Sequence, residues 1–248
     1  MTTAPDHDAD PASGGGAASP LDPVPADEGT PPRRQLPVWQ EMGLLLAVAL
    51  VLAVVIKAFL MQAFYIPSDS MDDTLVKNDR ILVEKVSSWG GGGPHRGDVV
   101  VFADPGGWLD PSESQSPGNP LFRALETVGL YPTGGHLVKR VIGVGGDEVT
   151  CCDSHGRVTV NGTPLNERSY LAPGVKPSEK VFDVKVAPGF IWVLGDNRSN
   201  SADSRYHLGD PGGGQVPVDD VVGRVFAVVW PLGHATLLHT PATFRSVR

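Results

Sequence analysis

Two serines and a distant lysine are the residues of this chain whose types and surroundings could do hydrolytic chemistry. Ser68 and Ser70 stand two positions apart, directly after an apolar segment of membrane length. Lys139 lies within a largely apolar run over positions 137–144. Burial disfavours the charged form of a lysine, and a neutral amine can remove the proton from a serine hydroxyl. These residues therefore suggest a serine nucleophile that acts at a membrane surface with a lysine as its base.

Each of these signals also has an ordinary structural interpretation. Two serines after a proline are typical of a turn, and a basic pair such as Lys139 and Arg140 commonly lies in solvent at a strand edge. A third segment, residues 195–205, is dense in polar side chains directly after an apolar run, and a solvated loop would explain that composition. The occurrence of all three in one chain favours a catalytic site. In a tight turn, both serine hydroxyls and a backbone N–H could converge on one oxyanion.

Residues 42–66 form the one apolar segment of membrane length, and Lys57 is its single charge. A helix of about 20 residues crosses the hydrocarbon core of a bilayer, so this segment predicts a transmembrane helix. A cleavable signal peptide fits less well, because the segment starts far into the chain and no basic region stands at the chain start. A buried core helix also fits less well, because apolar residues occupy every face. We assign residues 38–66 to the anchor.

The segment before the anchor, residues 1–37, is rich in proline, glycine and acidic residues. It has too few large apolar side chains to offset its ordering entropy, so we expect a disordered cytoplasmic tail. Arg33 and Arg34 favour a cytoplasmic amino terminus, although basic residues also follow the helix and the bias is small. The net charge of −8, with no basic stripe, argues against a nucleic-acid partner.

Residues 67–248 are expected to form one mostly β domain. Short alternating or apolar runs between turn signals predict strands, and their regular punctuation favours a barrel or sandwich over alternating strands and helices. The strands are expected at residues 80–86, 98–102, 137–144, 148–152, 157–161, 190–194 and 221–230.

Turn and loop signals separate these strands. Residues 153–156 and the Asn161-Gly162 pair predict hairpin turns. Residues 90–93 and 104–120 predict loops or insertions, and the apolar spacing over residues 121–130 permits one short helix.

The remaining candidate ligands point to no metal and no redox site. Cys151 and Cys152 are adjacent, so they give no disulfide framework and do not decide the compartment. The seven histidines are scattered without the spacing of a metal site. We therefore expect no metal and no cofactor.

In combination, these motifs resemble those of the type I signal peptidases, which are membrane-bound serine proteases with a Ser/Lys dyad. The resemblance extends from the apolar segment to about residue 230. It rests on IPSDSMDDTL, RGDVVVF, KRVIGVGGD and GDNRSNSADSR, which begin at residues 66, 96, 139 and 195. It implies a signal-peptidase-like, mostly β catalytic domain that follows one amino-terminal transmembrane helix and lies on the outer side of the cell membrane. It also implies secreted preproteins as substrates, cut after small residues, commonly in an A-x-A pattern.

The resemblance assigns roles to four residues of the site. Ser70 is the expected nucleophile and Lys139 the expected general base. Ser68 is the expected side-chain donor to the oxyanion. Ser201 is expected to hydrogen-bond and orient the lysine amine.

Two supporting ion pairs are also implied by the resemblance. Arg140 is expected to pair with Asp196. Asp203 is expected to pair with Arg205 in the same polar segment.

Three positions depart from the pattern of the family. Asp69 stands between the two serines, where glycine is usual, and Asp73 stands where proline is often found. Gly145 replaces a usual proline after the lysine segment. None of these removes a catalytic group, but Asp69 places a carboxylate beside the nucleophile.

Two other functions fit parts of this sequence. One is a membrane-anchored Ser/Lys protease that cleaves itself or a single regulatory target. It is disfavoured because, apart from a few stretches of small residues, the chain has no plausible self-cleavage segment. The other is an inactive anchored β module that serves as a scaffold, and the presence of both Ser70 and Lys139 disfavours it. The sequence does not decide the oligomeric state.

Overall fold

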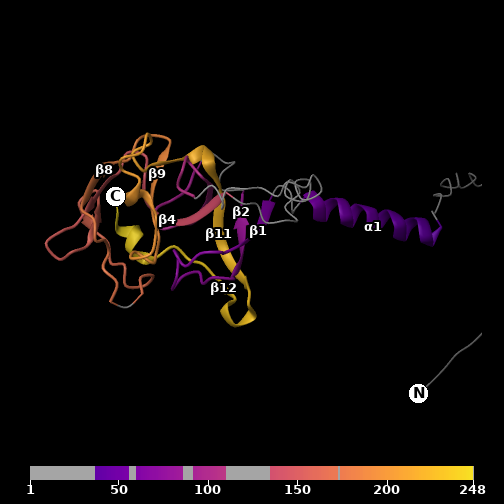
Figure 1. Cartoon of the computed structure of the whole chain (residues 1–248). Helices are drawn as coiled ribbons and strands as arrows, with labels where there is room; N and C mark the ends of the chain where they lie inside the picture. Colours follow the sequence, from indigo (N-terminus) through magenta and orange to yellow (C-terminus); the bar gives the residue numbers. More distant parts are fainter. Residues whose placement is uncertain (1–36, 56–59, 86–91, 110–134, 173, 248) are drawn as a thin grey trace, which may run out of the picture. The chain divides into compact units, whose positions relative to one another are not determined.

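The computed structural model describes residues 37–55, 60–85, 92–109, 135–172 and 174–247 of the chain. The predicted tail, apart from its last residue, and the possible helix at residues 121–130 therefore lie outside the described residues. Within the described ranges, strands dominate and form two antiparallel sheets (Figure 1). The prediction of a mostly β domain is confirmed.

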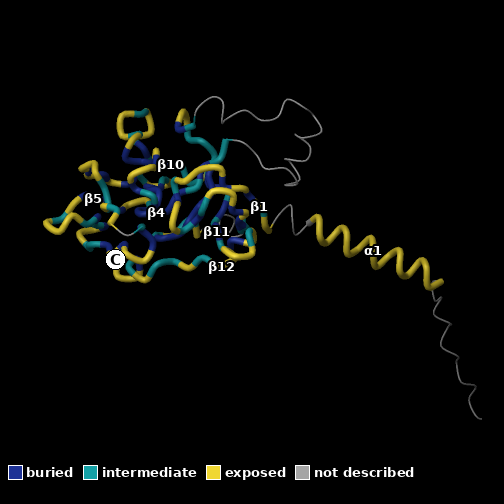
Figure 2. The backbone as a smooth tube through the Cα atoms, turned by 60° about the horizontal axis from the view of Figure 1, so that its bottom comes forward, coloured by how far each residue is buried: buried dark blue, intermediate teal, exposed yellow. Residues whose placement is uncertain are grey.

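Helix α1 extends over Val38–Val55 and is apolar on every face beyond its first turn. Its described side chains are exposed along the whole helix (Figure 2). Among the described residues, no helix combines the length and apolar character needed to cross a membrane.

Strand β1, Met61–Tyr65, occupies the last part of the segment predicted as one helix over residues 42–66. The helix prediction is wrong there, because β1 pairs antiparallel with β2, Arg80–Glu84, along its full length. The Phe64 side chain is buried in the domain core. An apolar run carries no signal that separates a continuing helix from a strand, so the partner strand decides.

The larger sheet has the strand order β1-β2-β11-β3-β4-β9-β10, and β12 pairs with β11. Its remaining strands are β3 Val99–Ala103, β4 His136–Val144, β9 Phe190–Leu194, β10 Val216–Pro217, β11 Val221–Trp230 and β12 Thr236–Leu237. The central strands β11, β3, β4 and β9 come from distant parts of the chain, so this sheet brings the sequence motifs together.

The smaller sheet has the order β7-β6-β5-β8. Its strands are β5 Glu148–Cys151, β6 Val158–Val160, β7 Thr163–Pro164 and β8 Phe182–Lys185. Four 3-10 helices are also described: η2 Ser204–Tyr206, η3 Val218–Asp220, η4 Leu232–His234 and η5 Ala242–Ser246.

Each of the seven predicted strands is present, as β2, β3, β4, β5, β6, β9 and β11. The two predicted hairpin turns are also present. Gly156 N–H donates to Asp153 O over 2.9 Å between β5 and β6, and Asn161 and Gly162 have positive φ angles of 50° and 74° between β6 and β7. Asparagine and glycine adopt this left-handed backbone most readily, which is why they mark the turn.

The core of the larger sheet follows the alternation of its strands. Val99 and Val101 of β3 face one apolar cluster, whereas Val100 and Phe102 face another. Successive side chains of a strand point to opposite faces, so a single strand serves both clusters. This alternation fixes which side chains share a face with the candidate base on the neighbouring strand β4.

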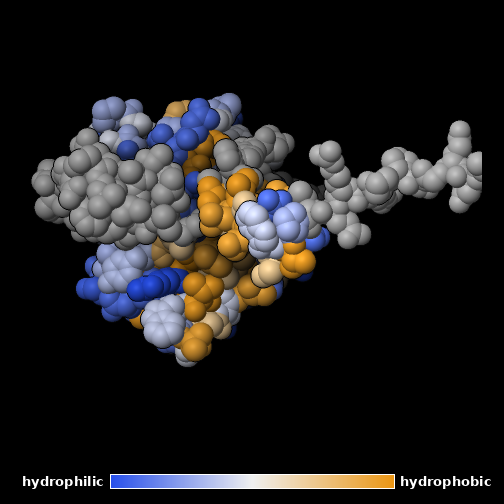
Figure 3. Space-filling view, turned by 90° about the vertical axis from the view of Figure 1, so that its right-hand side faces the viewer, coloured by the Kyte–Doolittle hydropathy of each residue, from blue (hydrophilic) through white to orange (hydrophobic). Residues whose placement is uncertain are grey.

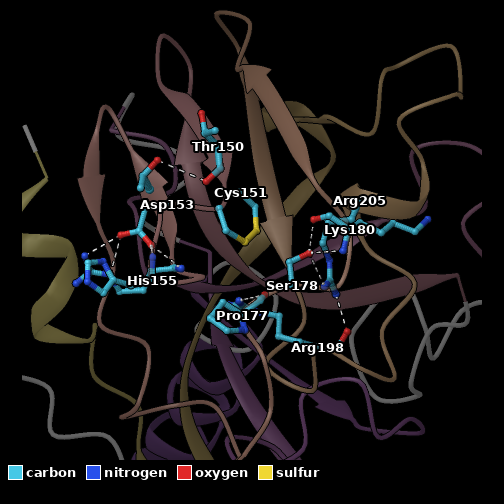
Figure 4. The surroundings of a disulfide bond; sticks show 12 residues. Thr150, Cys151, Asp153, His155, Pro177, Ser178, Lys180, Arg198 and Arg205 are labelled. Atoms are coloured by element: carbon cyan, nitrogen blue, oxygen red, sulfur yellow. Dashed lines mark hydrogen bonds and ion pairs between the residues drawn. A yellow bond between two sulfur atoms is a disulfide. The ribbon is translucent and has the colours of Figure 1, made fainter.

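Cys151, buried at the end of β5, is joined to Cys152 by a disulfide (Figure 4). A bond between neighbours closes a small ring and ties no distant segments together. The pair therefore provides no disulfide framework, as expected from its spacing.

Candidate active site

The segment that carries Ser70 follows β1 and is fixed by two buried side chains. Met71 and Leu75 lie in the core, and Leu75 N–H donates to Met71 O over 2.8 Å to form a single helical turn. Asn197 N–H donates to Ser70 O over 3.1 Å, and Asn197 Nδ2 donates to Asp69 O over 3.0 Å. The backbone of the nucleophile segment is therefore bound to the polar segment at residues 195–205.

Lys139 lies in the middle of β4, and its side chain reaches the nucleophile segment. Its Nζ is 2.7 Å from Ser70 Oγ and 3.1 Å from Val138 O. The side chain is 4% exposed. Two residues 69 positions apart in the sequence thus meet at hydrogen-bond distance, in the geometry required of a base and its nucleophile.

Burial lowers the pKa of Lys139 from 10.5 to about 8. The carboxylates of Asp203 and Asp196 act in the opposite direction, because they favour the charged amine. Burial dominates, so a substantial fraction of the amine is neutral at mildly alkaline pH. This is the protonation state that can accept the proton of Ser70.

The two other serines of the predicted site take different positions. Ser68 Oγ lies 3.3 Å from Ser70 Oγ, at the exposed side of the nucleophile. Ser201 is buried, and its Oγ makes no hydrogen bond within the described part of the chain. The expected bond from Ser201 to the lysine amine is therefore not made in this structure, in which Lys139 Nζ instead contacts Ser70 and Val138 O.

Arg140 and Asp196 form a buried ion pair directly behind the nucleophile segment. The guanidinium donates to both carboxylate oxygens of Asp196, over 2.8 and 2.6 Å, and to Gly97 O over 2.8 Å. Thr74 Oγ1 donates to the same carboxylate over 2.6 Å. Buried charges require such partners, and together they bind the Ser70 segment to the segment that follows β9.

Asp203 and Arg205 form a second buried pair, with Nη2 2.7 Å from Oδ2. The same carboxylate oxygen accepts Gly195 N–H over 3.0 Å, so the pair fixes the turn after β9. Arg198, also buried, donates to Gly195 O and pairs with Glu167 over 2.6 Å. These contacts hold the backbone that supports the nucleophile segment.

A family model described as signal peptidase, peptidase S26, matches residues 39–230 of this chain. The match includes Ser70, Lys139 and the polar segment at residues 195–205. The chain belongs to the signal peptidase family S26. It is accordingly a peptidase of that family.

Named relatives of this signal peptidase agree with the family. A probable signal peptidase I of Mycobacterium leprae is 38% identical over 81% of this chain and 78% of its own length. Signal peptidase I of Mycobacterium tuberculosis (strain ATCC 25618 / H37Rv) is 39% identical over 83% of this chain and 76% of its own length. A crystal structure of a signal peptidase I from Enterococcus faecalis V583 has 24% identity and a TM-score of 0.33, and it covers 53% of this chain and 95% of its own.

Ser70 and Lys139 of this peptidase line a groove of about 590 Å³. Apolar side chains from β1, β3 and β4 form much of its wall, including Phe64, Val101 and Val138. Ser68, which also lines this groove, is exposed.

Sequence reasoning missed several contributors to the site, among them Thr74, Tyr170 and Trp108. Thr74 stands in the nucleophile motif, but nothing in the sequence indicates its bond to a carboxylate 122 positions away. Tyr170, whose ring lies 4.4 Å from the Arg140 guanidinium, has no local motif. Trp108 lines the groove from a stretch predicted as loop, and only its large aromatic side chain within a segment rich in glycine, proline and serine could have marked it.

Proposed function

We propose that this protein is a membrane-anchored serine endopeptidase that removes signal peptides from secreted preproteins with a Ser70/Lys139 dyad. The observation that carries the proposal is the 2.7 Å contact between Lys139 Nζ and Ser70 Oγ at a buried amine. Family membership supports the substrate class, because the named relatives are signal peptidases.

In the proposed mechanism, neutral Lys139 removes the proton of Ser70 as Oγ attacks the scissile carbonyl carbon. The Ser70 N–H and the Ser68 hydroxyl stabilise the oxyanion of the tetrahedral intermediate. Lys139 then returns the proton to the leaving amine, which is the new amino terminus of the mature protein. A water molecule, deprotonated by the same amine, releases the acyl group from Ser70. This is a serine-lysine version of the serine protease triad.

The supporting residues act through the backbone in this proposal. The ion pairs of Arg140 with Asp196 and of Asp203 with Arg205 hold the two segments that meet at Ser70. Ser201 Oγ and the Ser70 carbonyl oxygen both approach Gly195, so Ser201 lies at this junction, where in this proposal it orients the amine. The proposal keeps that role for Ser201 as a prediction.

The groove suggests why small residues would precede the cleaved bond. Bulky side chains such as Phe64, Ile66 and Leu137 line it beside the nucleophile. In this proposal, they leave room beside Ser70 only for small side chains of an extended peptide. We therefore expect substrates with alanine before the cleaved bond to be preferred over otherwise identical substrates with leucine.

Apolar surface supports the proposed place at the membrane. On the face shown in Figure 3, apolar side chains are exposed among hydrophilic ones. Strands β1, β2, β11 and β12 are neighbours, and exposed apolar residues gather on them and on the adjoining turn: Met61, Tyr65, Trp230, Leu232 and Leu237. With the apolar helix α1, they support an anchored enzyme whose β domain, which begins at β1, lies on the extracytoplasmic side.

Cleavage of a synthetic preprotein by the detergent-solubilised full chain tests the catalytic proposal. Ser70→Ala and Lys139→Ala should each abolish cleavage while circular dichroism remains unchanged, because each group is chemically indispensable. Lys139→Arg should be equally inactive, because a guanidinium does not lose its proton. Lys77→Ala, an exposed lysine of the same groove, is the matched control and should retain activity. Turnover near wild type in Lys139→Ala would exclude the assigned base.

The proposed orientation has a separate test. Protease added to spheroplasts should digest the domain at residues 67–248 and leave the amino-terminal tail intact. Complete protection of the domain would overturn the extracytoplasmic location and, with it, the proposed substrate class.

A further inference from the structure

The loop after β3 is organised around Asp104. Its Oδ1 accepts the backbone N–H groups of Gly106 and Trp108, each over 3.0 Å, and its Oδ2 accepts that of Leu109 over 3.3 Å. Burial raises the pKa of Asp104, but these backbone donors outweigh that effect and hold the pKa below its usual value. A carboxylate that accepts several backbone N–H groups fixes a turn. The position of Trp108 is therefore defined by the loop itself.

Trp108 is almost buried, although it belongs to a loop. Its ring stacks on His207 with centroids 4.3 Å apart and planes 6° apart, and it meets Phe102 edge to face at 5.9 Å. His207 Nδ1 lies 2.6 Å from Asp210 Oδ2, which fixes the imidazole ring. The indole is thus held between β3 and the segment that follows η2.

Trp108 lies on the same side of the larger sheet as the candidate base. In β4, Leu137 and Lys139 alternate onto one face, and their partners across β3 are Phe102 and Val100. Leu137, Phe102, Val100 and Trp108 belong to one apolar cluster. Trp108 also lines the groove that contains Ser70 and Lys139. It is therefore one of the apolar side chains of the groove wall that come from outside the sheet.

We propose that Trp108 is a positioning residue for the general base: its indole, clamped by His207, excludes water from the groove side of the Lys139 amine. This inference rests on the proposed Ser/Lys mechanism and deepens it. Excluding water favours the neutral form of the amine, because water would stabilise the charged form. Trp108 itself transfers no proton.

The other charged groups around Lys139 do not supply this effect. Near Lys139 lie the buried pairs Asp203 with Arg205 and Asp196 with Arg140. The titratable side chains of Asp69, Lys77 and His136 line the same groove, and His207 with Asp210 lies against Trp108. The carboxylates of Asp203 and Asp196 raise the pKa of Lys139, so they oppose neutrality. Apolar cover is the contribution that lowers it.

The expected consequence follows from the titration of the amine. With a pKa of about 8, about a tenth of Lys139 is neutral at pH 7. If water admitted by Trp108→Ala raises the pKa by about one pH unit, the neutral fraction at pH 7 falls to about a hundredth. We therefore expect kcat/KM at pH 7 to fall about tenfold, with a much smaller loss above the pKa.

The experiment measures kcat/KM for a synthetic preprotein between pH 6 and 10 with the full chain in detergent. Trp108→Ala should move the acid limb to higher pH by about one unit, and Trp108→Phe, which keeps an aromatic cover, should restore most of the wild-type profile. His207→Ala should move the limb in the same direction by a smaller amount. Phe182→Ala, a buried aromatic of the smaller sheet, is the control for stability loss and should leave the limb in place.

Two results would overturn the inference. In one, the acid limbs of Trp108→Ala and wild type coincide while Ser70→Ala is inactive. In the other, Trp108→Ala raises KM equally at every pH, which would make Trp108 a substrate contact rather than a positioning residue. Full activity of Ser70→Ala would instead refute the proposed function, so the two failures can be told apart.

Discussion

Replacing Lys139 by methionine measures how strongly the fold disfavours a charged amine at this position. Methionine matches the length and apolar character of the lysine stem, so packing is largely preserved. The pKa of Lys139 is lowered from 10.5 to about 8 in the folded protein. This difference of about 2.5 pH units corresponds to about 3 kcal/mol of unfolding free energy.

The sign of the effect follows from proton binding. Between pH 8 and 10.5 the unfolded chain retains the lysine proton and the folded protein has lost it, so the stability of the wild type rises with pH. Below pH 8 both states carry the proton, and the contribution is absent. Lys139→Met has no such contribution at any pH. Relative to this variant, the wild type should therefore gain up to about 3 kcal/mol from pH 7 to pH 10.5.

Urea unfolding of the full chain in detergent, repeated from pH 7 to pH 10.5, gives this difference directly. Other groups titrate over the same range, but they do so in both proteins, and the difference between the two stability curves isolates Lys139. Lys77→Met, at an exposed lysine of the same groove, should follow the wild type. Parallel curves for wild type and Lys139→Met would refute the conclusion that burial lowers the pKa of this amine.

Two further predictions concern glycine and aspartate near the nucleophile. In Gly195→Ala the new methyl group would lie 2.5 Å from the Ser70 carbonyl oxygen, so cleavage of the synthetic preprotein should fall by about a hundredfold. The control is Gly209→Ala, whose methyl group would have no neighbouring atom within 4 Å, and it should retain wild-type cleavage activity. Survival of activity in Gly195→Ala would show that the close approach is dispensable. Asp69→Gly should leave the acid limb of the pH profile in place, because two other carboxylates raise the pKa of Lys139 and the Asp69 side chain is exposed. A limb displaced to lower pH, more so at low salt, would instead couple Asp69 to the base.

The strands of this protein were predictable because their signal is local. Alternation and turn residues mark them without knowledge of partners, as at Asn161 and Gly162, where the left-handed backbone selects the residue types. Strand β8, Phe182–Lys185, alternates as clearly but is only four residues long, so its pattern does not stand out from the surrounding sequence. The end of the apolar segment was mispredicted, since β1 owes its conformation to pairing with β2 rather than to its own residues.

The composition of the site was also largely available from the sequence. Ser70 and Lys139 could be selected because a serine in a motif and a lysine in an apolar run are chemically unusual in their surroundings. What the sequence alone leaves open is whether such a lysine is buried. The same residue pattern around Lys139 is compatible with a solvated lysine at a strand edge and with a desolvated lysine that acts as a base.

Tertiary structure decided that question, because desolvation is produced by atoms from elsewhere in the chain. Lys139 is buried in β4 opposite Val100 of β3, and it lies at hydrogen-bond distance from Ser70 because the fold brings distant segments together. No local sequence pattern predicts that Trp108 stacks on His207, because the two residues are 99 positions apart and only the tertiary fold brings their rings together. The sequence therefore determined which groups could react, and the packing of distant segments buries Lys139 beside Ser70 and lowers the pKa of its amine.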